Sequence, residues 1–220
     1  MHMVAVPKPA STVVLLDEMN RVYMTKRPYT MKFLGGCFVF PGGGVEKADQ
    51  MLDYDVFKNH DQENMLHPCF YVAAARELYE EIGILLCNKS DGSQLQIHRE
   101  RTLEYRSQLI NGEISFLQLL KKENMYLNVS RLTYFGNFVT PERSPIRFDT
   151  HFFLAYLPKG QQPDPDAHEI EEGLWITPEE ALSANDDNRM PMVLPTITTL
   201  KVIKNYLNGH PLKMPKILIP

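Results

Sequence analysis

Residues 76–84 read Arg76-Glu77-Leu78-Tyr79-Glu80-Glu81-Ile82-Gly83-Ile84. At 100° per residue on a helix, the three glutamates of this stretch fall within an arc of about 100°. Leu78 and Ile82 lie on the other side, where they can pack against a core. Pro68 suits the first position of such a helix and Gly83 suits its end. The stretch therefore predicts a helix from about Pro68 to Ile82 with one acidic face and one buried face.

The acidic face is electrostatically unfavourable on its own. Like charges four residues apart on a helix cost a few tenths of a kcal/mol, and the glutamates lie near the helix C-terminus, where the macrodipole disfavours anions. A divalent ion such as Mg²⁺ or Mn²⁺ would relieve this repulsion, because both ions take oxygen ligands and bridge substrate phosphates. The alternative is an ordinary solvated acidic face. The neighbouring arginine, the apolar opposite face and the terminating glycine favour the metal site.

This stretch resembles the Nudix box, whose core pattern is Arg-Glu-apolar-x-Glu-Glu-x-Gly-apolar, and every fixed position of that core is present. Residues 40–46 are similar to the Pro-Gly-Gly-x-x-Glu approach of the same family. The spacing differs, because 26 residues separate Asp49 from Arg76 where the family has seven. We interpret this as an insertion at about residues 50–68, so that either Asp49 or an insertion residue such as Glu63 replaces the usual acid. The insertion itself can be a surface loop without a role.

The resemblance implies metal-dependent hydrolysis of a nucleoside diphosphate linked to another group. It implies metal ligation by Glu77, Glu80 and Glu81, with the backbone carbonyl of Gly43 as a further ligand. Arg76 would orient the catalytic Glu77 through a charge-assisted hydrogen bond. The general base is either Glu77 or an acid on a later loop. The later candidates, each of which can also be an ordinary exposed acid, are Glu142, Glu169 and Glu172.

Residues 24–43 are similar to the motif of Nudix coenzyme A diphosphatases, Leu-Leu-Thr-x-Arg-small-x3-Arg-x3-Gly-x3-Phe-Pro-Gly-Gly. The matching positions are Thr25, Arg27, Gly36 and residues 40–43. Lys32 replaces the second arginine and Pro28 replaces the small residue. Lysine keeps the charge that a 3′-phosphate would attract but loses the two-pronged geometry of arginine. The alternative is that these cations are ordinary exposed side chains.

A later stretch, residues 140–154, resembles the acyl-CoA diphosphatase branch of the family, which shares an Arg-Phe-Asp-Thr-x-Phe-Phe strand and an insertion in the box. Residues 175–181 are similar to a common Nudix strand-to-helix ending. Arg147 is expected either to contact phosphate or to pair with Asp149. Together the resemblances cover about residues 11–205. The residues that they imply for substrate binding are Arg27, Lys32, Gly42, Gly44 and Arg147.

Strands precede and follow single helices without regular alternation, which indicates an α+β fold with a mixed sheet. We expect strands at about residues 11–16, 21–27, 37–40, 84–87, 134–140, 149–157 and 173–176. We expect helices at about residues 51–59, 68–82, 95–108, 114–122, from 177 onward, and 195–207. The resemblance implies a Nudix-type α/β/α sandwich with extra helices. Residues 1–220 are expected to form a single Nudix domain, with the extra helical segment at about 95–123 and a C-terminal helix at about 195–207.

Composition restricts the possible partners. The chain has 220 residues and a formal net charge of −4, whereas a general nucleic-acid binder normally has a basic excess. Cys37, Cys69 and Cys87 lack metal-ligand spacing and do not suggest a disulfide framework. No apolar run approaches the roughly 20 residues of a membrane span, and the N-terminus does not resemble a secretion signal. We therefore expect a cytoplasmic protein that acts on a small-molecule nucleotide, without a membrane or nucleic-acid partner. A homodimer is compatible with these observations.

Three functions follow from these patterns. The first is a coenzyme A or acyl-CoA diphosphatase that uses Mg²⁺ or Mn²⁺ and yields 3′,5′-ADP and a phosphopantetheine product. The second is a Nudix pyrophosphatase for ADP-ribose, a nucleotide sugar or a nucleoside triphosphate, which the imperfect positions 28 and 32 favour. The third is a Nudix-fold binding module without hydrolysis. The three intact glutamates argue against the third, because a pure binder does not need clustered carboxylates.

Overall fold

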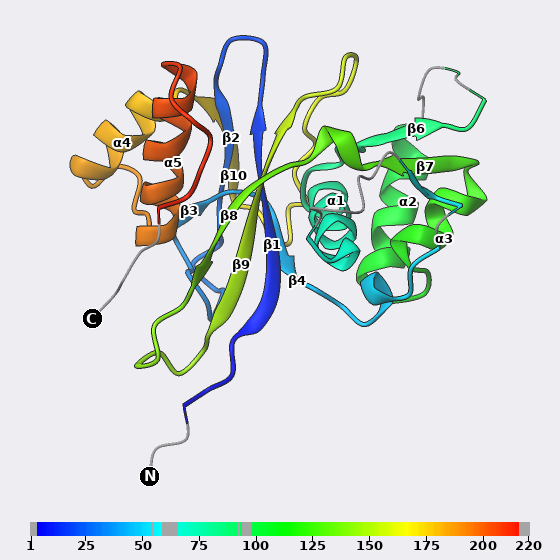
Figure 1. Ribbon diagram of the computed structural model, residues 1–220, viewed down its shortest axis with the longest axis horizontal. Coiled ribbons are helices and arrows are strands. Elements are labelled where there is room, and N and C mark those ends of the chain that lie inside the picture. Colours follow the sequence, from blue (N-terminus) through cyan, green and yellow to red (C-terminus); the bar gives the residue numbers. More distant parts are fainter. Residues whose placement is uncertain (1–3, 54, 59–65, 92, 94–97, 216–220) are drawn as a thin grey trace.

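The computed structural model of the chain describes residues 4–53, 55–58, 66–91, 93 and 98–215. In this part of the chain a mixed sheet lies between two helical layers (Figure 1). Helices α4 (Pro178–Asp186) and α5 (Leu194–Leu207) cover one face, and α1 (Pro68–Ile82) with its neighbours lies on the other. The expected α/β/α sandwich is confirmed.

The central sheet is built around the first strand. Its strands are β1 (Lys8–Leu16), β2 (Val22–Lys26), β8 (Thr133–Val139), β9 (Phe148–Tyr156) and β10 (Glu172–Ile176), in the order β10-β2-β1-β9-β8. Strands β1 and β2 pair antiparallel, and β1 pairs in parallel with β9 from Lys8↔Phe148 to Leu16↔Tyr156. Two short strands, β3 (Phe38–Val39) and β4 (Gly42–Gly44), pair with β2 and β1. The parallel pair makes the sheet mixed, as expected.

The side chains of β1 alternate between two hydrophobic cores, one on each face of the central sheet. Val13 and Leu15 face the side of α1, whereas Val14 and Leu16 face the side of α4 and α5. Successive side chains of a strand point to opposite faces, so four consecutive buried residues fit a strand with a helical layer on each side.

Helix α1 has the boundaries that the sequence predicts. The His67 side chain accepts a hydrogen bond from the Cys69 amide at 3.4 Å, and Pro68 occupies the first turn. The helix ends at Gly83, whose φ of 72° is the left-handed conformation that glycine adopts without strain. Ala73, Ala74 and Ala75 are fully buried, and their small side chains allow the helix to lie close to the sheet.

The insertion and the extra helical segment pack together. Helices α2 (Arg99–Ile110) and α3 (Phe116–Lys122) lie beside a small sheet of β5 (Phe57–Lys58), β6 (Cys87–Lys89) and β7 (Met125–Asn128). Strand β5 belongs to the insertion and pairs in parallel with β7. An ion pair of 3.0 Å between Lys121 and Asp53 adds a second link. The described part of the insertion around β5 is therefore packed into the fold and is not a free surface loop.

The expected helix at 51–59 is wrong for the residues that the structure describes there. A 3₁₀ turn, η1 (Ala48–Gln50), precedes the segment, and β5 lies inside it. Val56 and Phe57 are 4% and 1% exposed, because they fill the core beneath α2 and α3. The expected strand at 84–87 begins three residues later, as β6. The residues before α2 that were also expected to be helical, 95–97, lie outside the described part of the chain.

Among the described residues no helix has both the length and the apolar composition to cross a membrane. Cys37, Cys69 and Cys87 are all free thiols.

Candidate active site

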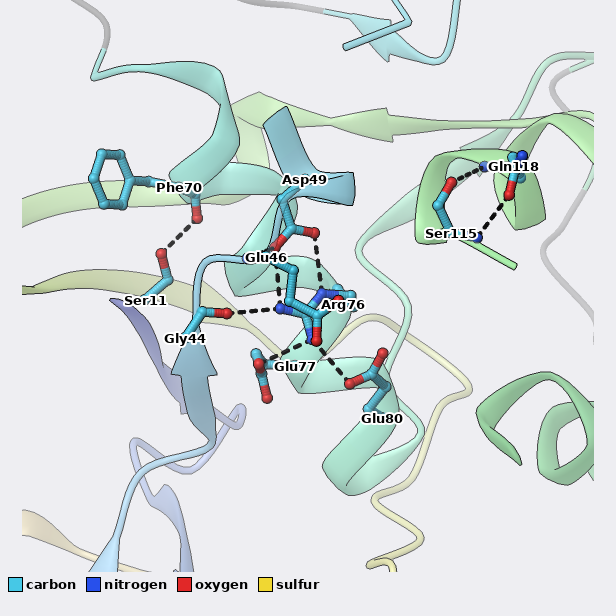
Figure 2. A network of polar contacts seen from close by, with 10 residues as sticks. All are labelled: Ser11, Gly44, Glu46, Asp49, Phe70, Arg76, Glu77, Glu80, Ser115 and Gln118. Carbon is cyan, nitrogen blue, oxygen red and sulfur yellow. Dashed lines mark hydrogen bonds and ion pairs between the residues drawn. The ribbon is translucent and has the colours of Figure 1, made fainter. Parts of the chain in front are cut away.

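Arg76 is the centre of a buried polar network between α1 and the glycine strand β4 (Figure 2). Its side chain is 4% exposed. Nε and Nη2 donate to Oδ1 and Oδ2 of Asp49, each at 3.0 Å, and Nη2 also donates to the Gly44 carbonyl at 2.8 Å. This guanidinium thus joins three segments: α1, β4 and η1.

The remaining nitrogen of Arg76 faces two glutamates on its own helix. Nη1 lies 2.9 Å from Glu77 Oε1 and 2.9 Å from Glu80 Oε2, and Glu46 is more distant at 3.8 Å. Helical spacing explains the second contact, because residues four apart lie one above the other. The structure therefore places Arg76 where it can fix Glu77, as the resemblance implies.

Asp49 is the acid that pairs with Arg76, a position for which the sequence offered either Asp49 or Glu63. It is 1% exposed, and its Oδ2 also accepts a hydrogen bond from the Glu46 amide at 2.8 Å. A buried carboxylate needs such partners. Glu63, the other candidate, lies outside the described residues.

The glycines of β4 allow the backbone to approach the acidic helix. Gly43 pairs with Ser11 of β1, and a Cβ atom at position 43 would lie 2.5 Å from Glu77 Oε1. The Gly42 amide donates to Glu81 Oε2 at 3.3 Å. Ser11 in turn donates to the Phe70 carbonyl at 2.8 Å, which holds β1 against the first turn of α1 (Figure 2). Two carboxylates, Glu77 and Glu81, therefore face the glycine strand.

A cavity of about 310 Å³ opens at this place. Its acidic side consists of Glu77, Glu81 and Glu169, and Arg27 is the cation among its described lining residues. Gly42, Gly43 and Gly44 also line it. Its apolar wall includes Met31, Phe33, Phe138, Phe148, Phe152 and Val193. A wider hollow of about 770 Å³ lies elsewhere, near β6 and β7, but its described lining contains no carboxylate. We therefore place the candidate active site at the acidic cavity.

A family model described as the NUDT19 Nudix domain matches residues 67–202, which is more than half of the chain. The chain belongs to the Nudix hydrolase family. The stretch that resembles the Nudix box is thus the part of α1 that carries Arg76, Glu77, Glu80 and Glu81.

Curated Nudix relatives are 28–29% identical to the chain over the aligned stretches. The acyl-coenzyme A diphosphatase NUDT19 of Xenopus laevis is 28% identical over 203 residues, covering 73% of this chain and 53% of that protein. The protein of the same name from Gallus gallus is 29% identical over 197 residues, covering 68% and 52%. A Caenorhabditis elegans protein provisionally named nudix hydrolase 7 is 28% identical over 200 residues, covering 90% and 61%. The chain spans between about half and three fifths of the length of these relatives.

Solved structures agree on the Nudix fold. A Nudix hydrolase from Alicyclobacillus acidocaldarius superposes with a TM-score of 0.83 at 26% identity, covering 97% of this chain and 100% of that chain. The similarity therefore spans nearly the whole length of both chains.

Of the other expected site residues, some line this cavity and others do not. Glu169 lines it, whereas Glu142 and Glu172 are exposed and are not among its lining residues. Lys32 is exposed and outside the cavity lining as well. The Arg147 guanidinium donates to the carbonyls of Thr140 at 2.9 Å and Ala5 at 2.7 Å, and it does not line the cavity either. Substrate binding by Lys32 and Arg147 stays a prediction without a contact in the cavity.

The surroundings of the Nudix-box glutamates disfavour their ionised form and raise their pKa values. Burial raises the pKa of Glu77 to about 7, although the charge of Arg76 acts in the opposite direction. Burial also raises the pKa of Glu80 to about 7. The pKa of Glu81 lies well above its ordinary value, because the group is buried and because Glu77 and Glu169 repel its charge. A cation would stabilise the ionised form of all three.

The donor set fits a divalent metal in chemistry and charge, since it consists of buried carboxylate oxygens beside a glycine backbone. The side chains nevertheless do not form a complete set of metal ligands. Among the described residues, no three His, Cys, Asp or Glu side chains are arranged so that they could hold one ion. Glu80 is bonded to Arg76 and does not line the cavity. Ligation by Glu77, Glu80, Glu81 and Gly43 therefore remains a prediction, with Glu77 and Glu81 placed best for it.

These pKa values predict how the stability of the metal-free protein depends on pH. A carboxyl group whose pKa is raised on folding binds its proton more tightly in the folded state, so stability is lost as pH rises through the range between the two values. The free energy of unfolding should fall between about pH 4.5 and pH 7, where Glu77 and Glu80 lose their protons. Urea unfolding of the metal-free protein at several pH values measures this. Glu80→Gln should show a smaller fall, and equal slopes for parent and variant would contradict the assignment.

Proposed function

We propose that this Nudix domain hydrolyses a pyrophosphate bond in a nucleoside diphosphate linked to another group, with coenzyme A or an acyl-CoA as the most favoured substrate. The observation that carries the proposal is a pair of carboxylates, the half-buried Glu77 and the buried Glu81, which face the glycine strand β4 at a cavity. The family and the names of the NUDT19 relatives support the choice of coenzyme A. The products would be 3′,5′-ADP and 4′-phosphopantetheine or its acylated form.

We infer that Mg²⁺ or Mn²⁺ is held by Glu77, Glu81 and the Gly43 carbonyl, with Glu80 joining if it leaves Arg76. When bound, the metal neutralises the pyrophosphate charge and lowers the pKa of a bound water molecule. Arg76 keeps Glu77 in place, because the guanidinium is itself fixed by the two oxygens of Asp49. Such fixed charges need no rearrangement when the reaction occurs.

The chemical step adds water across a P–O–P linkage. The water oxygen bonds to one phosphorus, the bond from that phosphorus to the bridging oxygen breaks, and the bridging oxygen leaves with the other phosphate. A general base accepts the proton of the water. Glu77 and Glu169 are the candidates that line the cavity.

The apolar wall of the cavity suits a substrate whose second half is not another nucleotide. Phe33 and Phe148 lie with ring centroids 5.2 Å apart, and Phe138 and Phe152 continue the same wall. Apolar and aromatic walls of this kind bind the apolar parts of ligands, while a few polar groups fix the orientation. The pantetheine arm or an acyl chain fits this description better than a second ribose does.

A second candidate substrate group is ADP-ribose, a nucleotide sugar or a nucleoside triphosphate. One observation favours it. Of the cations that the sequence suggests for a 3′-phosphate, Arg27 lines the cavity, but Lys32 and Arg147 do not. Less positive charge at the cavity reduces the advantage of coenzyme A over nucleotides without that phosphate. A homodimer and a cytoplasmic location remain further predictions.

A substrate screen tests the proposal. The purified chain should be incubated with Mg²⁺ or Mn²⁺ and with coenzyme A, acyl-CoAs, ADP-ribose, NADH and dinucleoside polyphosphates, and the products separated by chromatography. We expect 3′,5′-ADP from coenzyme A or its thioesters, with the highest kcat/KM for one of these. Cleavage of the other nucleotides alone would support the second candidate. No turnover of any diphosphate would leave a binding module.

A further inference from the structure

Arg106 of α2 is a buried cation that donates three hydrogen bonds to backbone carbonyls of the described residues. The residue is 2% exposed. Nε donates to the Glu80 carbonyl at 2.8 Å, Nη2 to the Glu81 carbonyl at 3.0 Å and Nη1 to the Asp164 carbonyl at 2.8 Å. The nearest carboxylate oxygen recorded for it, on Asp166, is 4.0 Å away. Three short bonds satisfy a guanidinium that would otherwise be costly to bury.

These bonds complete the C-terminus of α1. The last four carbonyls of a helix have no partner within the helix. Here the Gly83 amide donates to the Tyr79 carbonyl at 2.9 Å and the Asp164 amide to the Ile82 carbonyl at 2.9 Å. The Glu80 and Glu81 carbonyls accept from Arg106, and the Asp166 amide also donates to Glu81 at 2.8 Å. The positive charge of Arg106 also lies at the helix end that favours cations.

Arg106 thus holds the backbone of two Nudix-box glutamates, Glu80 and Glu81, and the side chain of Glu81 lines the cavity. Its third bond, to Asp164, fixes the loop that continues to Glu169, and the Glu169 amide in turn donates to the Asp166 carbonyl at 3.2 Å. Glu81 and Glu169 line the same cavity from these two segments. One guanidinium therefore connects both backbones that carry cavity carboxylates.

We propose that Arg106 is a positioning residue for the acidic site: it holds the end of α1 and the 164–169 loop so that Glu81 and Glu169 face one cavity. The proposal rests on the proposed function. It also gives α2, which belongs to the extra helical segment, a direct link to the site. Residues that orient metal ligands through such contacts typically change metal affinity or activity by about 10- to 100-fold when replaced.

Mn²⁺ binding tests this without relying on turnover. Free Mn²⁺ is measured by its electron paramagnetic resonance signal in titrations of the parent, Arg106→Met and Arg106→Lys. We expect Arg106→Met to bind Mn²⁺ about 10- to 100-fold more weakly and Arg106→Lys to lie between, because an ammonium keeps the charge but reaches fewer of the three carbonyls. At saturating Mn²⁺, kcat should fall more than KM rises, since the substrate wall is untouched.

Two controls separate positioning from general destabilisation. Leu109→Ala removes a buried side chain of the same helix without removing a bond to α1, and Arg99→Gln removes an exposed ion pair to the Asp164 side chain. Both should bind Mn²⁺ within about twofold of the parent. If Arg106→Met does not fold, Arg106→Lys decides. Parent-like binding by a folded Arg106 variant overturns this inference alone, as does an equal loss in Leu109→Ala. A parent that binds no Mn²⁺ overturns the proposed function as well.

Discussion

Glu81→Gln is expected to lower kcat by about a thousandfold, while the fold is retained. Glu81 is 5% exposed and lines the cavity, and glutamine has the same shape without the charge. Metal ions contribute several kcal/mol to the stabilisation of developing charge, and each 1.36 kcal/mol is tenfold in rate, so loss of a principal ligand has an effect of this order. Steady-state kinetics with saturating Mn²⁺ measures it.

The same substitution has an opposite effect on the metal-free protein. Because burial and two neighbouring carboxylates raise the pKa of Glu81, removing its charge should leave the free energy of unfolding unchanged or higher at neutral pH. The increase in Tm on adding Mn²⁺ should shrink, since less metal binds. Glu179→Gln, on the exposed side of α4, is the matched control and should behave like the parent. Retention of more than a tenth of the parent kcat by Glu81→Gln would contradict the site.

Arg76→Met is expected to lower the free energy of unfolding by about 3–5 kcal/mol, because it leaves a buried charge without its partner. Asp49 is 1% exposed and receives two of the guanidinium hydrogen bonds. Replacing both partners with apolar residues should cost less than the sum of the single changes. Urea unfolding of Arg76→Met, Asp49→Leu and the double variant measures the coupling, which we expect to be about 1–3 kcal/mol.

An exposed ion pair provides the comparison for this cycle. Arg189 and Asp187 lie 3.0 Å apart, but their side chains are 66% and 58% exposed. Arg189→Met should therefore change the free energy of unfolding by less than about 1 kcal/mol. Strict additivity of Arg76→Met and Asp49→Leu would show that Asp49 is not the acid that pairs with the box arginine, and Glu63→Gln would then be the next variant to measure.

The acidic helix could be predicted from sequence because its signals are local. Helical periodicity, Pro68 at its start and Gly83 at its end all lie within one segment, and the structure has the same boundaries. Strand β4 could not be predicted in this way, since glycine has low strand propensity. It forms because β1 offers a pairing edge and because the approach of Glu77 excludes a side chain at Gly43.

Residues that act across the fold were harder to find. Glu169 was one of three equivalent loop acids in the sequence, and the choice depends on where the loop passes the cavity. Asp49 and Glu63 could not be separated, because the path of the insertion decides between them. Arg106 was missed, since its partners lie 25, 26 and 58 residues away and no local pattern marks a buried arginine in an otherwise exposed helix. Lys32 and Arg147 hold motif positions but do not line the cavity, so their role in substrate binding stays a prediction.

The pairing between β5 and β7 limits how this domain can be shortened. It joins Phe57 to Leu127, two positions that are far apart in the gene but adjacent in space. Phe57, together with Phe116 and Leu120 of α3, belongs to one buried cluster. Deleting either addition alone would expose the apolar surface of the other to water. We therefore expect that a shortened domain stays folded only if both additions are kept or both are removed.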